Sequence, residues 1–301
     1  FIDGVDKLYT RLSLQEVKDY MAFTVLNSAA SYLSDEFYEA KFDFYGRTLS
    51  GQQEPRLRWK RSLATTDAVL SEALGEIYVK KYFPQESKNR MLKLVANLQK
   101  ALQQHIEHLD WMSEKTKARA LEKLAAITVK IGYPDKWRDY TALEISPEKS
   151  YWENLKNASK FETAYMLEKV GKEVDKSIWY MSPQTVNAYY NPTTNEICFP
   201  AGILQPPFFY ADADDAVNYG AIGVVIGHEM THGFDDMGRQ FDKDGNLSDW
   251  WTSEDTRQFN LRADILADQY SSIIVIDTVH ADGRFTLGEN IADQGGLRVA
   301  Y

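Results

Sequence analysis

The residues with the clearest chemical potential form one short run, His228-Glu229-Met230-Thr231-His232. If this run is helical, the two histidines lie four residues apart on one face, so both imidazoles can reach the same ion. Neutral imidazole nitrogen suits zinc, and a catalytic zinc site needs three protein ligands and an open position. The run therefore predicts two of three zinc ligands. The competing interpretation is a chance match within a buried helix.

Glu229 follows His228 directly, so its carboxylate is expected beside the ion rather than on it. From that place it can take a proton from a metal-bound water and pass the proton to a leaving amine. A purely structural zinc site closes its fourth position and has no need of this carboxylate. Glu229 therefore favours catalysis over a zinc-stabilised scaffold.

A second carboxylate motif, Gly288-Glu289-Asn290-Ile291-Ala292-Asp293, lies downstream. Glu289 and Asp293 are four residues apart and share a helix face, so Glu289 can complete a site of two histidines and one glutamate. Asp293 would then accept a hydrogen bond from a ligand histidine and fix its tautomer. Gly295 and Gly296 would let two helix backbones approach closely. The alternative is an ordinary solvated helix face, but the position downstream of a zinc motif favours the functional interpretation.

The run Val186-Asn187-Ala188-Tyr189-Tyr190 is typical of an extended strand. A strand at the edge of a sheet can bind a peptide through main-chain hydrogen bonds, and the Asn187 side chain can add a donor and an acceptor. By pattern alone the run is also consistent with a plain β-strand. The function of this segment therefore depends on its neighbours in the fold.

Composition narrows the classes of partner. The chain has 301 residues and a formal net charge of −10, and its basic residues cluster only in short helical patches, which argues against nucleic acid as a partner. Cys198 is the single cysteine, so no disulfide can form within the chain. It lies in an apolar stretch, and we expect a small buried hydrophobic side chain there.

The segments that must position these residues change in character along the chain. Residues 7 to about 130 predict successive helices, one of them opened by a capping box at Ser13 to Glu16. Later segments predict a fold of mixed helix and strand, which makes the chain mainly α with a small α+β part. The predicted elements of these later segments are two short strands within 182–200, a buried helix over 218–234, a helix over 252–271, a strand over 273–277 and a helix over 287–299. The predicted boundary lies near residues 135–150.

Taken together, the motifs resemble the neprilysin-like zinc endopeptidases of peptidase family M13, which include endothelin-converting enzyme and the bacterial PepO-type proteins. The likeness covers most of the chain, and three ordered motifs make it specific. They are Asn187 to Tyr190, His228 to Asp236 and Gly288 to Asp293, with further similarity at Arg58 to Arg61, Trp111-Met112 and Ile131 to Pro134.

This resemblance implies a function for each motif. It implies one zinc ion per chain held by His228, His232 and Glu289, with Glu229 as general base and Asp293 orienting His228. Asn187 and Ala188 correspond to the strand that holds the substrate backbone. Four further positions correspond to a hydrophobic pocket for the residue after the scissile bond: Ile203, Phe208, Val224 and Val225. Asp235 would support His232, with a surface aspartate as the competing interpretation.

The resemblance also implies an architecture. A thermolysin-like catalytic domain at 141–301 would follow a helical domain at 1–140, and the two would enclose a chamber that admits oligopeptides. Family members are longer at both ends, so the chain resembles an internal fragment whose partners include the remaining segments of its own full-length chain. Those segments supply a histidine and an arginine that stabilise the oxyanion. His105, His108 and His280 do not match that role, so a catalytically weakened zinc-binding fragment or scaffold is the alternative.

Two further expectations concern relatives. The scarcity of cysteine differs from the disulfide-rich animal ectoenzymes and indicates a bacterial member, in the cytoplasm or in the cell envelope, including the periplasm. An aminopeptidase of the wider His-Glu-x-x-His group is another alternative. Such enzymes carry a motif that recognises the free amine of the substrate, and the sequence has no such motif.

Overall fold

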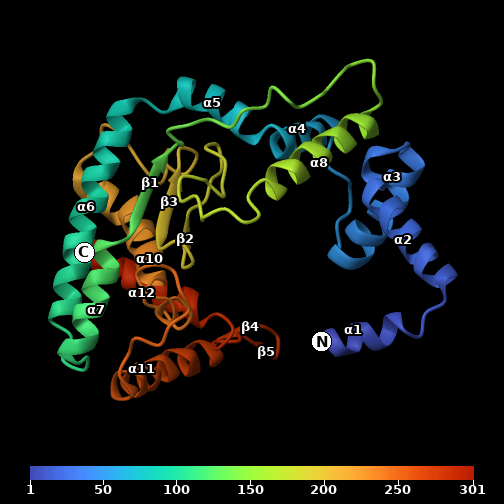
Figure 1. The fold of residues 1–301 in the computed structure, drawn as a ribbon. Helices are drawn as coiled ribbons and strands as arrows, with labels where there is room; N and C mark the ends of the chain where they lie inside the picture. Colours follow the sequence, from blue (N-terminus) through green and yellow to red (C-terminus); the bar gives the residue numbers. More distant parts are fainter. The chain divides into compact units, whose positions relative to one another are not determined.

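The computed structural model describes residues 1–301, which form two compact units (Figure 1). One unit comprises Phe1–Leu70 and Asp139–Glu173, and the other comprises Ser71–Arg138 and Val174–Tyr301. This division differs from a single boundary near residue 140, because the helices α6 Gln85–Glu107 and α7 Glu114–Ala125 bury their apolar faces with the strands of the second unit. The assignment of 1–140 and 141–301 as functional domains stays a prediction.

The first unit is helical throughout. Its elements are α1 Ile2–Tyr9, α2 Leu14–Ala29, the 3₁₀-helix η1 Ala30–Tyr32, α3 Asp35–Phe42, the π-helix η2 Asp43–Thr48, α4 Arg58–Val69 and α8 Tyr151–Leu167. The predicted capping box is confirmed, because the Ser13 side chain accepts from the Glu16 backbone and the Glu16 side chain accepts in return. The Tyr32 ring packs on Tyr151 and Trp152, which joins η1 to α8.

The second unit holds every strand and the candidate site. Its helices are α5 Ser71–Tyr82, α6 Gln85–Glu107, α7 Glu114–Ala125, α9 Asp215–Asn218, η3 Tyr219–Gly223, α10 Val224–His232, η4 Gly238–Gln240, α11 Ser253–Ser271 and α12 Leu287–Ala300. Its strands are β1 Thr128–Gly132, β2 Tyr189–Asn191, β3 Glu196–Pro200, β4 Ile274–Ile276 and β5 Val279–His280. The mainly helical fold with a small α+β part is therefore confirmed.

A three-stranded sheet with the order β1-β3-β2 supports one side of the site. β3 is fully buried and pairs with β1 in parallel and with β2 antiparallel. The β2–β3 hairpin confirms the two strands predicted within 182–200, whereas β1 was not predicted. β2 lies at the edge of the sheet, so one side of its backbone has no strand neighbour.

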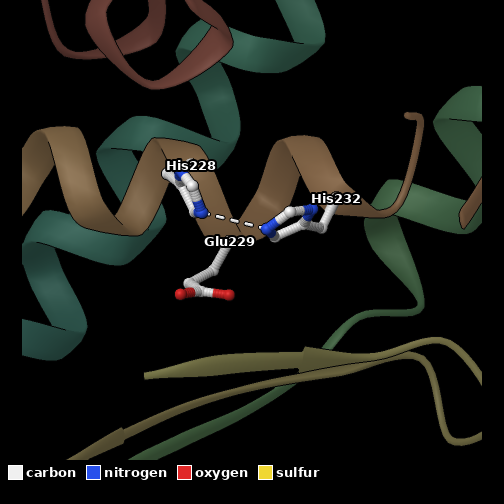
Figure 2. A group of neighbouring side chains, drawn as sticks. All are labelled: His228, Glu229 and His232. Carbon is white, nitrogen blue, oxygen red and sulfur yellow. Dashed lines mark hydrogen bonds between the residues drawn. The ribbon is translucent and has the colours of Figure 1, made fainter. Parts of the chain in front are cut away.

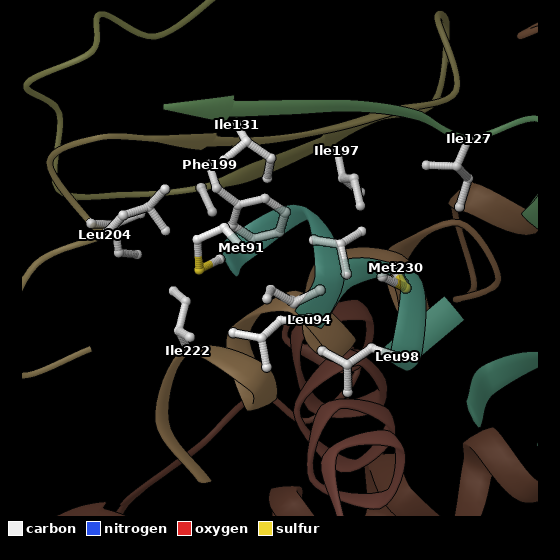
Figure 3. Packing of buried hydrophobic residues seen from close by; sticks show 14 of the residues in the cluster. Met91, Leu94, Leu98, Ile127, Ile131, Ile197, Phe199, Leu204, Ile222 and Met230 are labelled. Carbon is white, nitrogen blue, oxygen red and sulfur yellow. The ribbon is translucent and has the colours of Figure 1, made fainter. Parts of the chain in front are cut away.

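The core of the second unit forms where α6 crosses the sheet (Figure 3). The buried apolar residues of α6 recur at helical spacing, which produces one continuous apolar face. These residues are Met91, Leu94, Val95, Leu98, Leu102 and Ile106. They share a core with Ile131, Ile197 and Phe199 of the strands and with Ile226 and Met230 of α10. The helix with the zinc motif is thus fixed from its apolar side.

The later elements agree closely with the sequence pattern. The predicted helices over 218–234, 252–271 and 287–299 correspond to η3 with α10, to α11 and to α12. Thr252 caps α11 through a hydrogen bond from the Asp255 backbone, and Cys198 is a buried free thiol as expected. None of the helices combines the length and apolarity that crossing a lipid bilayer requires.

Candidate metal centre

Helix α10 brings two imidazoles together. The Nε2 atoms of His228 and His232 are 2.9 Å apart, and the rings meet edge to face (Figure 2). Glu229 extends from the same helix toward the strands, and its carboxylate and the two imidazoles offer ligand atoms within 4.8 Å of one another. The helical spacing in the sequence therefore produces the expected convergence.

Helix α12 supplies the carboxylate that the sequence assigns as third ligand. The Oε2 atom of Glu289 lies 3.3 Å from Nε2 of His228 and 3.7 Å from Nε2 of His232. The Glu289 side chain is 69% exposed, whereas both imidazoles are 18% exposed. Three donor atoms from two helices thus surround one point at the mouth of a pocket.

Each histidine is oriented by an aspartate through its other ring nitrogen. Nδ1 of His228 lies 2.8 Å from Oδ1 of Asp293, and Nδ1 of His232 lies 2.7 Å from Oδ2 of Asp235. Because carboxylates only accept, both rings carry a proton on Nδ1 and direct Nε2 inward. Two Nε2 lone pairs at this distance repel each other unless a proton or a metal cation lies between them. With Glu289 beside them, the donor set fits a zinc ion.

Asp235 is buried, so its interpretation as a surface residue is wrong. Its Oδ1 accepts backbone N–H groups from Met237 at 2.9 Å and from Gly238 at 2.6 Å. Burial alone would lower the pKa of His232. The hydrogen bond and the negative charge of Asp235 raise the pKa by more than burial lowers it, so the net shift is upward. The turn after α10 therefore fixes the aspartate that orients His232.

Glu229 occupies a different environment from Glu289. It is buried, and burial raises its pKa to about 7, with the negative charge of Glu289 adding to the rise. The positive charge of His232 and a hydrogen bond from the Tyr190 backbone oppose this rise. A carboxylate whose pKa lies near neutrality can both accept and release a proton at physiological pH.

The site opens into a cavity of about 440 Å³ between α10, α12 and the edge of the sheet. Its walls include Asn187 and Ala188, which directly precede β2, so the strand begins two residues later than the motif. The Asn187 Oδ1 accepts from the Ala188 backbone at 2.9 Å. The Asn187-Ala188 motif therefore lines the same cavity as the candidate metal donors. A sheet edge that binds a peptide for cleavage must lie close to them in this way.

The four positions that resemble a hydrophobic pocket are not among the residues that line this cavity. Ile203 is buried in the core, with Phe208 and Val225 packed against the same core, and Val224 begins α10. The lining instead includes Pro192, Met237 and Gly238. Sequence reasoning did not select these three, although Met237 and Gly238 follow the zinc motif closely. The hydrophobic pocket stays a prediction.

The other three histidines contact backbone carbonyls elsewhere. His105 contacts the Arg298 carbonyl, His108 the Gln104 carbonyl and His280 the Ser271 carbonyl. None of these three carbonyls belongs to a residue assigned as a metal donor.

The distance between α10 and α12 depends on glycine. A Cβ on Gly296 would lie 2.4 Å from the Val224 carbonyl oxygen and 2.9 Å from the His228 backbone nitrogen. A Cβ on Gly227 would in turn lie 2.9 Å from Cα of Gly296 on the other helix. Absence of a side chain at these crossing points lets α12 bring Glu289 and Asp293 to the histidines, as the Gly295-Gly296 pair predicts.

Replacing Gly296 by Ala is expected to destabilise the fold by about 1–3 kcal/mol, because a methyl group must displace backbone at the helix crossing. The same displacement moves His228 from Asp293 and should weaken zinc binding. Chemical denaturation and zinc titration measure the two effects. Gly220→Ala is the matched control, since Gly220 is exposed in a helical turn with no atom within 4 Å of the new Cβ. An unchanged zinc affinity in Gly296→Ala would contradict the expectation.

Comparison with known proteins gives an independent view of the same residues. Two models of peptidase family M13 match the chain, the N-terminal model over residues 1–134 and the other over residues 187–301. The neutral endopeptidase of Lactobacillus helveticus is 39% identical over 100% of this chain and 46% of that protein. Human endothelin-converting enzyme 1 is 39% identical over 100% of this chain and 40% of that protein.

Solved structures show the same relationship. The zinc metalloprotease ZMP1 of Mycobacterium tuberculosis in complex with an inhibitor superposes with a TM-score of 0.93 at 44% identity, over 99% of this chain and 46% of that chain. PepO from Lactobacillus rhamnosis superposes with a TM-score of 0.89 at 32% identity, over 97% and 47%. The chain thus spans less than half the length of these relatives.

Proposed function

The chain belongs to peptidase family M13, and from this premise we propose that it carries the zinc-binding and catalytic residues of an endopeptidase that hydrolyses oligopeptides. One observation carries the proposal. Two imidazoles from α10 and a carboxylate from α12 converge on one point, with a buried carboxylate beside them. Relatives named neutral endopeptidase and zinc metalloprotease support it.

In this proposal, His228, His232 and Glu289 hold one zinc ion. The aspartate bonds at both Nδ1 atoms support it, because they leave Nε2 of each ring free to coordinate. When bound, zinc polarises the scissile carbonyl and lowers the pKa of a water molecule in the open position. Asp293 and Asp235 keep the two rings in the tautomer that coordination requires.

Glu229 is the general base. Its carboxylate takes a proton from the attacking water and later gives it to the leaving amine. The buried position supports both steps, because the carboxylate lies beside the two imidazoles, within reach of a water molecule in the open position. A strongly acidic carboxylate would accept the proton less readily and a strongly basic one would retain it.

The edge next to β2 is the proposed peptide-binding surface. An extended substrate can add to this edge as a further strand, with Asn187 and Ala188 contacting its backbone. The position of both residues in the cavity wall supports this role. A preference for a hydrophobic residue after the scissile bond, through Ile203, Phe208, Val224 and Val225, rests on resemblance alone.

A second candidate is a zinc-binding fragment with weakened catalysis. It is favoured by one observation, that the chain spans less than half of its relatives. The remaining segments of a full-length chain would then be its partners, and they would supply the oxyanion donors. A lost oxyanion donor typically costs about 10²- to 10³-fold in rate.

Metal removal tests the proposed function. A chelator is expected to abolish cleavage of an oligopeptide that is blocked at both ends, and one equivalent of zinc should restore it. Mass spectrometry of the products identifies the cleaved bond, and elemental analysis gives the zinc content. Cleavage that survives complete zinc removal would exclude the proposed mechanism. Cleavage of only unblocked peptides would indicate an aminopeptidase, and zinc binding without cleavage would favour the weakened fragment.

A further inference from the structure

A buried lysine lies behind the metal centre. Lys123, in the last turn of α7, is 1% exposed. Its Nζ donates hydrogen bonds of 2.7 Å to the carbonyl oxygens of Gly238 and Phe241. These two carbonyls lie at the two ends of the turn η4 that follows the zinc-motif helix, so one side chain fixes the whole turn.

The surroundings keep the Lys123 side chain charged. Burial lowers its pKa to about 8, and the negative charges of Asp235 and Asp242 oppose that fall, so the group is mainly an ammonium at neutral pH. Its Nζ also lies within 6 Å of three aromatic ring centroids, a distance at which a cation is attracted to the ring face. The rings are Tyr190 at 5.8 Å, Phe234 at 5.7 Å and Trp250 at 5.9 Å.

A chain of hydrogen bonds leads from this ammonium to a metal donor. Lys123 binds the Gly238 carbonyl, and the Gly238 N–H donates to Oδ1 of Asp235. Oδ2 of the same carboxylate accepts from Nδ1 of His232. Since every member is held by the next, a shift of the turn would move Asp235 and rotate the His232 ring.

A lysine that served only to fill the core would be a poor choice here. Burying an ammonium is costly, and an apolar side chain of similar length would fill the same space at lower cost. Charge-assisted bonds to two carbonyls instead specify one conformation of the turn. The Trp250 indole N–H also donates to the Phe241 carbonyl, at 3.0 Å, which strengthens the same anchor.

We propose that Lys123 is a positioning residue of the metal centre, which aligns His232 with His228 by holding the Gly238–Phe241 turn against Asp235. This inference rests on the zinc site proposed above. It assigns to α7, a helix without any of the proposed metal donors, an influence on zinc affinity that acts through the turn and Asp235.

The test uses the full-length protein with Lys123→Met, which keeps the length of the side chain and removes its charge and donors. The zinc dissociation constant, measured by competition with a chelator, is expected to rise about 10- to 100-fold, as for partners outside the ligand set. Asp255→Asn is the matched control for lost stability. Asp255 is buried and accepts from Ser113, Thr116 and Thr252, which ties α7 to α11 rather than to the turn.

The control separates positioning from general destabilisation. Asp255→Asn should lower the melting temperature but leave the zinc dissociation constant unchanged. An equal loss of zinc affinity in both variants, or none in Lys123→Met, would overturn the inference. If Lys123→Met does not fold, Lys123→Gln takes its place. Its shorter and uncharged amide cannot reproduce both charge-assisted bonds, so zinc affinity should still fall, and unchanged zinc affinity would overturn the inference.

Combining Lys123→Met with Asp235→Asn tests whether Lys123 acts through the hydrogen bonds of Asp235. If Lys123 acts through Asp235, the double variant should lose no more zinc affinity than the weaker-binding single variant, whereas independent effects multiply. Multiplied effects would therefore refute the hydrogen-bond route. Absence of zinc binding in the wild-type protein would instead refute the proposed function, so the two failures are distinguishable.

Discussion

Replacing Glu229 by Gln is expected to lower kcat/KM for an oligopeptide by about 10²- to 10⁴-fold, the contribution typical of a general base. The amide has nearly the same shape as the carboxylate but cannot take a proton from water. The metal donors are untouched, so one zinc ion per chain should remain bound. Steady-state kinetics and elemental analysis on the same preparation measure both quantities.

The structure also predicts the effect on stability. Glu229 is buried, and its raised pKa shows that the protein disfavours its charge. A neutral amide removes that desolvation cost and can still accept the hydrogen bond from the Tyr190 backbone. The melting temperature of Glu229→Gln should therefore equal or exceed that of the wild type, so a loss of activity cannot be attributed to unfolding.

Glu86→Gln is the matched control, because Glu86 is an exposed residue in the first turn of α6. It changes the net charge by the same amount and should leave kcat/KM unchanged. Turnover near the wild-type level in Glu229→Gln would remove Glu229 from its role. Loss of zinc from this variant would have a different meaning, since Glu229 would then be a ligand.

The candidate site could be predicted because its determinants are local. Helical periodicity alone places His228 beside His232, and the same period places Glu289 beside Asp293. The Gly295-Gly296 pair indicated the close crossing that brings the two helices together. Periodicity does not determine which helices pack together, so the convergence of the two motifs follows only from the folded structure.

The fold was less predictable where the decisive contacts are distant in sequence. The short strand β1 follows α7 directly, and its pairing partner β3 lies far along the chain, so no local pattern marked it. The apolar face of α6 predicts burial but does not identify its partners, which include β1 and the distant strand β3.

Lys123 shows the same limit at a single residue. A lysine in the last turn of an amphipathic helix is typical of a solvated side chain that interacts with the helix dipole. Nothing in the adjacent sequence indicates that two carbonyls and three aromatic rings would surround it. Residues that support a site from a distance are visible only after folding.

Replacing Glu289 by Val is expected to release the metal. The substitution removes the carboxylate that lies 3.3 Å and 3.7 Å from the two Nε2 atoms and leaves two imidazoles as the remaining donors. Zinc affinity should fall by more than the roughly 100-fold that marks the loss of a partner outside the ligand set. Elemental analysis after dialysis and competition with a chelator measure this fall, and activity should disappear with the metal.

Two comparisons make the result specific. Gln294→Val changes an exposed polar residue of the same helix to the same β-branched residue, so it reproduces any loss of helix propensity and should retain zinc. Asp293→Asn weakens only the orientation of His228, and its affinity should lie between those of the wild type and Glu289→Val. This order of affinities follows from the geometry of α12.

The zinc contents of Glu289→Val and Glu229→Gln together show which of the two carboxylates is the third metal ligand. If Glu289→Val keeps its zinc, the third ligand must lie elsewhere, and Glu229 is the nearest candidate because it offers an oxygen within 4.8 Å of the ring nitrogens. Zinc would then be lost from Glu229→Gln instead. Retention in Glu229→Gln together with loss in Glu289→Val is the only combination in which the buried carboxylate stays free to move a proton while the exposed one holds the ion.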